Sequence, residues 1–283
     1  MQHFHYDSLD STNLQALRLW NEVGAARPHG TSPPAPFAVT AGTQTAGLGR
    51  AGRTWQSPSG GLWLSIAWPA AQPLPHYQSI PLVVGLATLR TLVDLTFLDC
   101  QIKWPNDILL ADRKLAGILC QAHASSDGPP TIGNGNWKME SPPIPFLILG
   151  IGINANFPTA SLGTNLRTPP ITLRDALARD INLADLTAHL LANIESTLTR
   201  FDHPTAEPPL TPFLPELRNH LAWRGQTVTV TDTTTAPPPS PITGTLLDLD
   251  AAGQLLLQTP AGIQTITIGD LQLSRSPVPL SAF

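Results

Sequence analysis

A short stretch rich in glycine and arginine is the first place where this sequence could do chemistry. The segment "TAGLGRAGRTW" sets Gly47, Gly49 and Gly52 at the spacing of a dinucleotide-binding fingerprint. Glycines let a backbone close around a ligand, and the guanidinium groups of Arg50 and Arg53 can neutralise phosphate. The segment is therefore a candidate site for binding an anion.

The context of the fingerprint excludes a dinucleotide-binding unit. Such a unit needs a strand directly before the glycines, a helix directly after them, and an acidic residue about 20 positions later. Here Pro58 and Gly60 break the following segment, and no Asp or Glu occurs between Arg53 and Asp94. A Walker loop is excluded because no GxxxxGK[ST] is present. Either a plain surface loop or a flap that closes over phosphate remains, with Trp55 available to stack on a base.

Lysine is scarce, and most of it falls in one region. The three lysines are Lys103, Lys114 and Lys138, and "KWPND" places the first beside Asn106 and Asp107. A compact ammonium group can contact a carboxylate or phosphate where a guanidinium does not fit, and an aspartate can bind Mg²⁺. An exposed hairpin with ordinary charges is the alternative.

Two further polar groups stand at the ends of expected elements. "GIGIN" ends an apolar strand on Asn154, and strand ends often face ligands, although an asparagine there can also form a turn. "STN", at Ser11 to Asn13, taken alone is typical of a helix N-cap.

The elements around these residues predict an α+β body. Helices are expected at about 12–20, 80–95, 172–179 and 183–201, the last two capped by Thr172 and Asn182. Strands are expected at "FAVTAG", "GGLWLSIAW", "CQIKW", "KLAGILCQAH" and "FLILGIGIN". The third and fourth should form a hairpin hinged at "LADR". Residues 124–144, rich in Gly, Pro and Ser, are expected to be a loop insertion.

The sequence pattern changes at residue 225, where short predicted strands replace helices. Four short strands, "QTVTVT", "ITGTLLDLD", "GQLLLQT" and "IQTITIG", predict a small all-β barrel. The expected division is a body at 1–203, a Pro-rich segment and helix at 204–224, and the barrel at 225–283.

Composition limits the class of protein. The chain has 283 residues, 42% of them hydrophobic, and a net charge of −4, which gives no general attraction to nucleic acid or membranes. No apolar run approaches the length of a membrane span and no signal peptide is recognisable, so a cytoplasmic protein is expected. Cys100 and Cys120 fit no metal or redox spacing and are expected to be reduced core residues.

The ordered set of motifs resembles the biotin protein ligases, which attach biotin to carrier proteins. The match runs through "LDSTN", "QTAGLGRAGRTWQSPSGGLWLS", "KWPNDILLADRKLAGIL", "GIGIN" and the barrel, about residues 7 to 275. The resemblance implies a mixed-sheet catalytic domain of the class II synthetase-like biotin/lipoate ligase type, followed by a Src-homology-3-like barrel. It also implies ATP, Mg²⁺ and biotin as ligands, and a biotin carboxyl carrier domain as partner. Monomer and homodimer stay open.

The resemblance assigns a role to each motif residue. The implied biotin-binding residues are Ser11, Thr12, Asn13, Gln44, Gly47, Leu48, Gly49, Arg50 and Lys114. The implied ATP and adenylate residues are Arg53, Trp55, Lys103, Asn106, Asp107 and Asn154. Catalysis is assigned to Lys114, Arg50 and Asp107, with Asp107 also as the Mg²⁺ ligand. None of these groups lies in the barrel, so its removal is expected to damage transfer to the carrier more than adenylate formation.

Two features separate this chain from some biotin protein ligases, and two other functions stay open. Leu48 stands where the family most often has a basic residue, which predicts faster release of the adenylate intermediate. "LDSTN" begins at Leu9, so no DNA-binding domain is expected before it. The alternatives to a biotin ligase are a lipoate or octanoate protein ligase and a non-enzymatic biotin sensor.

Overall fold

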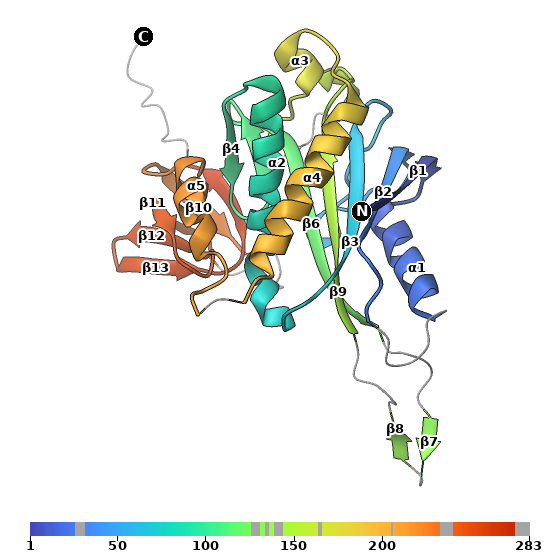
Figure 1. The fold of residues 1–283 in the computed structure, drawn as a ribbon. Helices are drawn as coiled ribbons and strands as arrows, with labels where there is room; N and C mark the ends of the chain where they lie inside the picture. Colours follow the sequence, from blue (N-terminus) through green and yellow to red (C-terminus); the bar gives the residue numbers. More distant parts are fainter. Residues whose placement is uncertain are drawn as a thin grey trace, which may run out of the picture.

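Two β-sheets organise the computed structural model of the chain (Figure 1). The structure describes residues 1–25, 32–125, 131–133, 136–138, 144–163, 166–204, 206–232 and 240–274. The larger sheet has seven strands and the smaller has five, and a two-stranded ladder stands apart from both.

The seven-stranded sheet is mixed. Its order is β1 (Gln2–Leu9), β2 (Phe37–Gln44), β3 (Leu62–Pro69), β9 (Ile144–Ile153), β6 (Arg113–Ser125), β5 (Asp107–Leu110) and β4 (Cys100–Lys103). The β1–β2 pair is parallel and the other pairs are antiparallel. The mixed sheet that the resemblance implied is thereby confirmed.

Helices cover both faces of this sheet (Figure 1). α1 (Thr12–Ala25) packs on one face, and α2 (Ile80–Thr96) and α4 (Leu183–Phe201) pack on the other. Strand β9 shows the alternation that this requires: Phe146 and Ile148 contact the α1 side, while Leu147 and Leu149 join the larger core. The segment Leu74–Thr96 is long and apolar enough to cross a membrane, but most of it is buried in this core.

The smaller sheet is antiparallel and shares the core of the body. Its order is β13 (Gly262–Ile266), β12 (Leu255–Thr259), β11 (Ile242–Leu249), β10 (Thr227–Thr231) and β14 (Asp270–Leu273). The described residues also form the helices α3 (Leu173–Leu177) and α5 (Leu214–Asn219). Val228 and Leu246 belong to the same buried cluster as α2, and Trp104 Nε1 donates to Gly253 O at 2.9 Å. The Src-homology-3 type of this sheet and the boundaries at 203/204 and 224/225 stay predictions.

Most predicted elements are confirmed, including the caps of α3 and α4: Thr172 accepts from Asp175 N, and Asn182 accepts from Ala184 N and Asp185 N. The helix expected at 12–20 is longer and ends at Ala25.

The predicted hairpin of two strands is wrong, because a third strand lies between them. The chain reverses at the turn residues Trp104–Asn106, and β5 begins at Asp107 and pairs with β4. A second reversal, with Ala111 and Asp112 at positive φ, leads into β6. Two edge strands, β1 and β14, were not predicted at all.

The segment 124–144 was expected to be a plain loop, but its described residues include strands. β6 continues to Ser125, and β9 begins at Ile144. Between them β7 (Thr131–Gly133) and β8 (Asn136–Lys138) pair as a two-stranded ladder. The rest of that segment lies outside the described residues.

Candidate functional site

A small pocket with one polar wall, called here the inner pocket, lies between the start of α1 and the face of the seven-stranded sheet. Its floor is formed by three glycines, Gly117 on β6 and Gly150 and Gly152 on β9. A Cβ atom on Gly150 would stand 2.2 Å from Asn13 Oδ1, and one on Gly152 would stand 2.6 Å from Trp55 Nε1. Only glycine therefore lets Asn13 and Trp55 lie directly on the sheet.

The polar wall of the inner pocket is a buried hydrogen-bond network. Ser65 Oγ lies 2.7 Å from Thr12 Oγ1 and 2.6 Å from Asn13 Oδ1. Gln44 Oε1 accepts from Thr12 N at 2.8 Å, and Asn13 Nδ2 donates to Gln121 Oε1 at 2.9 Å. Since Thr12 and Asn13 are buried and bonded to the sheet, "STN" does more than start a helix.

The glycine–arginine stretch forms a small hairpin over the inner pocket, called here the flap (Gly47–Trp55). Trp55 N donates to Gly47 O at 2.8 Å, and Gly49 N donates to Arg53 O at 2.7 Å. The turn between them uses positive φ at Ala51 and Gly52, and a single turn of 3-10 helix takes the place of an α-helix. The rejection of a dinucleotide-binding turn is consistent with this geometry.

A second cavity of about 530 Å³, called here the cationic cavity, shares Trp55 with the inner pocket. Its lining includes five cationic side chains, Arg50, Arg53, Lys103, Lys114 and Arg167. It includes two carboxylates, Asp107 and Asp270. The cavity therefore has an excess of positive charge, although the whole chain has a net charge of −4.

Asp107 separates the two lysines at the base of the cationic cavity. Lys114 Nζ lies 2.7 Å from Asp107 Oδ1, and Lys103 Nζ lies 3.9 Å from Asp107 Oδ2. Lys103 also donates to Thr168 Oγ1 at 3.1 Å. Burial lowers the pKa of Lys103, and the charge of Asp107 partly counteracts this effect. Lys114 Nζ stands 5.0 Å above the Trp55 ring.

Two asparagines support the cations, one by a side-chain contact and one through the backbone. Arg50 donates to Asn106 Oδ1 at 2.9 Å, and Asn106 Nδ2 donates to Ile118 O at 2.7 Å. Burial lowers the pKa of Arg50, and the charges of Asp270 and Asp107 oppose this effect. Asn154 Nδ2 donates to the backbone oxygens of Lys114 and Ile171, each at 3.2 Å.

The structure distributes the predicted residues between the two cavities. Ser11, Thr12, Asn13, Gln44 and Leu48 line the inner pocket. Arg50, Arg53, Lys103, Asp107 and Asn154 line the cationic cavity. Trp55, Asn106 and Lys114 line both. Gly47 and Gly49 provide the backbone of the flap, where a Cβ on Gly47 would stand 2.4 Å from Trp55 O.

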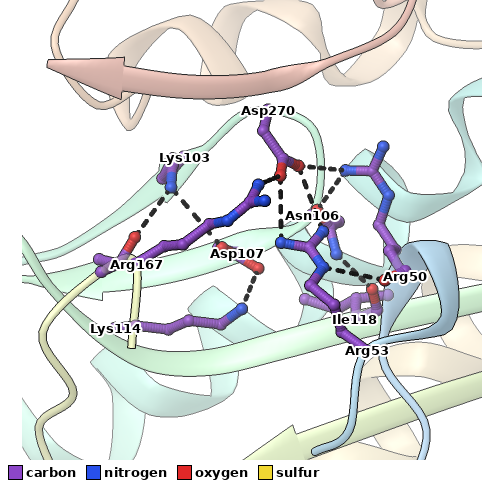
Figure 2. A network of polar contacts seen from close by, with 10 residues as sticks. Arg50, Arg53, Lys103, Asn106, Asp107, Lys114, Ile118, Arg167 and Asp270 are labelled. Carbon is purple, nitrogen blue, oxygen red and sulfur yellow. Dashed lines mark hydrogen bonds and ion pairs between the residues drawn. The ribbon is translucent and has the colours of Figure 1, made fainter. Parts of the chain in front are cut away.

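Sequence reasoning missed Asp270 and Arg167. Asp270, on β14, lies 3.0 Å from Arg53 Nη1 and 2.6 Å from Arg167 Nη1, and 3.9 Å from Arg50 Nη1 (Figure 2). The five-stranded sheet thus contributes a carboxylate to the site. The only signal in the sequence is an acidic residue after Gly269, in a segment where no strand was predicted.

The side chains available as ligands limit how the expected Mg²⁺ could be bound. The described residues include no group of three or more His, Cys, Asp or Glu side chains that could hold a metal ion. Both oxygens of Asp107 face lysine ammonium groups. The residues fit Mg²⁺ only as an ion that brings further oxygen ligands, as it does when bound to nucleotide phosphates.

Comparison with known proteins agrees with this arrangement. Residues 26–128 match the Biotin/lipoate A/B protein ligase family, and residues 225–274 match the Biotin protein ligase C terminal domain. The "Bifunctional ligase/repressor BirA" of Bacillus subtilis is 30% identical over 275 residues, which are 96% of this chain and 74% of the relative. The "Biotin--[acetyl-CoA-carboxylase] ligase" of Paracoccus denitrificans is 29% identical, covering 93% of this chain and 96% of the relative.

The solved structures point the same way. The Aquifex aeolicus biotin protein ligase in complex with biotin and ATP superposes with a TM-score of 0.73 at 25% identity, covering 97% of this chain and 99% of that one. A mutant of that ligase in complex with biotin gives a TM-score of 0.72, also at 25% identity, with coverage of 98% and 99%. Since motifs, fold and relatives agree over nearly the whole chain, the chain belongs to the biotin protein ligase family.

Proposed function

We propose that the protein activates biotin with ATP as biotinyl-5′-AMP and transfers the biotinyl group to a lysine of a biotin carboxyl carrier domain of a carboxylase. The observation that supports this best is the wall shared by the two cavities. Trp55, Asn106 and Lys114 line both the inner pocket and the cationic cavity. With biotin in the inner pocket and ATP in the cationic cavity, the biotin carboxylate and the α-phosphate of ATP would meet at this wall.

The inner pocket suits biotin. The bicyclic urea needs hydrogen-bond partners at one edge and apolar contacts elsewhere, and the side chains of Ser11, Thr12, Asn13 and Gln44 offer donors and acceptors. Leu48, Leu64 and the glycine floor supply apolar walls. The carboxylate at the end of biotin's chain would then approach Lys114 at the shared wall.

The cationic cavity suits ATP. Arg50, Arg53, Lys103 and Lys114 can neutralise phosphate oxygens, and Trp55 offers an aromatic face for the adenine. Asp107, with phosphate oxygens, would hold the Mg²⁺ carried by ATP, which adds positive charge beside the phosphates. Asn154 would act on the nucleotide side by holding the Lys114 backbone.

The first step needs charge neutralisation more than a base. The biotin carboxylate is ionised at neutral pH and attacks the α-phosphorus of ATP, forming a C–O–P anhydride and releasing pyrophosphate. Lys114 and Arg50 would bring the two anions together and align them. The flap, closed over the product, would keep water from hydrolysing the anhydride.

The second step needs a neutral amine. The carrier lysine attacks the anhydride carbonyl, forms an amide, and releases AMP. The amine must lose a proton, and Asp107 is the carboxylate nearest to Lys114, 2.7 Å away. We assign Asp107 this role as general base.

The two half-reactions can be tested separately. We expect biotin-dependent exchange of pyrophosphate into ATP, and incorporation of radiolabelled biotin into a carrier domain. Exchange with lipoate or octanoate in place of biotin would identify a different protein ligase. Binding of biotin without exchange or incorporation would instead identify a biotin sensor.

A further inference from the structure

We propose that Arg167 is a further ATP-binding residue, which contacts the β- and γ-phosphates and afterwards the pyrophosphate product. The inference rests on the proposed function, because it names a partner for one part of the same substrate. Arg167 lies on the loop between β9 and α3, outside every motif that carries the family resemblance. It lines the cationic cavity but not the inner pocket.

The carboxylate of Asp270 sets the position of Arg167 in the cavity. Its Nη1 lies 2.6 Å from Asp270 Oδ2, and Arg53 contacts both oxygens of the same carboxylate at 3.0 and 3.3 Å (Figure 2). Arg50 approaches it at 3.9 Å. Three guanidinium groups thus converge on one carboxylate, which leaves positive charge available to a second anion.

The side chain of Arg167 is the most exposed of the five cationic side chains that line the cavity. The side chain of Lys103 is 9% exposed and that of Arg50 is 24% exposed, whereas that of Arg167 is 56% exposed. Reaction at the α-phosphorus must occur at the shared wall beside Lys114. The two phosphates that leave must therefore extend away from that wall, and the exposed Arg167 lies on the path to solvent.

This assignment separates Arg167 from residues that hold biotin or the adenylate. Biotinyl-5′-AMP retains one phosphate, and only ATP and pyrophosphate have the phosphates that Arg167 would contact. Loss of this side chain should therefore affect the first half-reaction and leave the second unchanged. A purely structural ion pair with Asp270 would affect both half-reactions or neither.

The test compares Arg167→Ala with a matched surface variant, Arg174→Ala. Arg174 is similarly exposed, at 49%, and pairs with Asp180 at 3.7 Å outside the cationic cavity. The whole enzyme is used, with biotin-dependent ATP–pyrophosphate exchange for the first half-reaction. Transfer from preformed biotinyl-5′-AMP to a carrier domain measures the second.

We expect Arg167→Ala to raise the KM for ATP and for pyrophosphate about tenfold, the scale of one charge-assisted hydrogen bond reduced by exposure to solvent. The KM for biotin and the rate of transfer from the preformed adenylate should not change, and Arg167→Lys should restore part of the affinity. Unchanged ATP and pyrophosphate KM values would overturn the proposal, as would an equal loss in both half-reactions. Absence of exchange in the unsubstituted enzyme would instead remove the proposed function itself.

Discussion

At the scale of single residues, two carboxylates hold the cations of the site in place. Asp107 lies between Lys103 and Lys114, and Asp270 lies between Arg53 and Arg167. Without these acids the cations would repel one another at short range, and their side chains would not stay aimed into the cavity. Because cations outnumber acids, the site remains attractive to a polyanion.

Lys114→Ala should remove the charge nearest to the reacting groups. The expected loss is about 3–4 kcal/mol of transition-state stabilisation, the scale for one preorganised charge donor. Biotin-dependent ATP–pyrophosphate exchange measures it, with Arg174→Ala as the surface control. A loss of activity no greater than that of the control would mean that Lys114 is not at the reacting centre.

Lys103 should couple ATP binding to proton uptake. Burial lowers its pKa below the ordinary value of 10.5 in the free protein. Phosphate beside it would raise the pKa again, so at pH values between the lowered pKa and 10.5 the complex binds more protons than the free protein. Calorimetry of ATP binding at alkaline pH, in buffers of different ionisation enthalpy, should show uptake. Lys103→Arg should abolish it, and equal uptake in both proteins would exclude Lys103 as the source.

Most residues of the site could be predicted from their motifs, but their partners could not. Local sequence placed Lys103 near Asp107 because they are four residues apart. Arg53 and Asp270 are 217 residues apart, and only the packing of β14 beside the flap brings them together. No pattern around Asp270 distinguishes it from an ordinary exposed aspartate.

At the scale of elements, β9 positions the inner pocket by the alternation of its side chains. Phe146 and Ile148 fill the space under α1, and the next two residues on that face, Gly150 and Gly152, leave room for Asn13 and Trp55. The strand is therefore packed at one end and open at the other. The inner pocket lies where the large side chains stop.

Gly150→Ala should close part of that space. Its Cβ would stand 2.2 Å from Asn13 Oδ1, so Asn13 must leave Ser65 and Gln121. We expect a stability loss of about 1–3 kcal/mol from overpacking, and at least about tenfold weaker biotin binding from the displaced amide. Thermal unfolding and biotin titration measure the two effects.

Gly85→Ala is the matched control for that substitution. Gly85 is buried in α2, and an added Cβ would meet its nearest neighbour at 3.8 Å, an ordinary contact. Stability should rise by about 0.5–1 kcal/mol, because alanine favours the helix. Biotin affinity should stay unchanged. Equal biotin affinity in both glycine variants would contradict the role of the glycine floor.

Many elements were predictable, and the ones that were missed were hidden by their short length or by their polar residues. α2 was predicted from the length of an apolar run without alternation, and the cap of α4 follows known rules. β5 has only four residues, too few to show a period, and it lies between two turns. β1 does alternate, with Phe4 and Tyr6 toward α1 and His3 and His5 toward Thr40, but its many polar residues conceal that pattern.

At the scale of the whole molecule, the two sheets share one core, and the flap contacts both. The change in texture at residue 225 suggested a separate barrel, yet Val228, Leu246 and Leu271 are buried in the cluster that contains α2. Removal of residues 225–283 would therefore expose core side chains and take Asp270 from the cavity. The expectation that such a truncation spares adenylate formation no longer follows, and single substitutions test the contribution of this sheet more cleanly.

The flap should become more protected when both cavities are filled. Without ligand, Asp270 offsets the expected repulsion between Arg50 and Arg53, but the Arg53 side chain is 42% exposed, and exposed ion pairs stabilise by about 0–1 kcal/mol. Gly49 and Gly52 also make an ordered flap entropically costly. Biotinyl-5′-AMP would add phosphate contacts for the arginines and a base for Trp55, and so tie the flap to the seven-stranded sheet. Hydrogen exchange of amides 46–53 should slow markedly with biotin and ATP present, while the buried amides of α4 serve as the reference and keep their rates. Equal protection of the flap in both states would show that the hairpin is already rigid, and that it does not close in response to ligand.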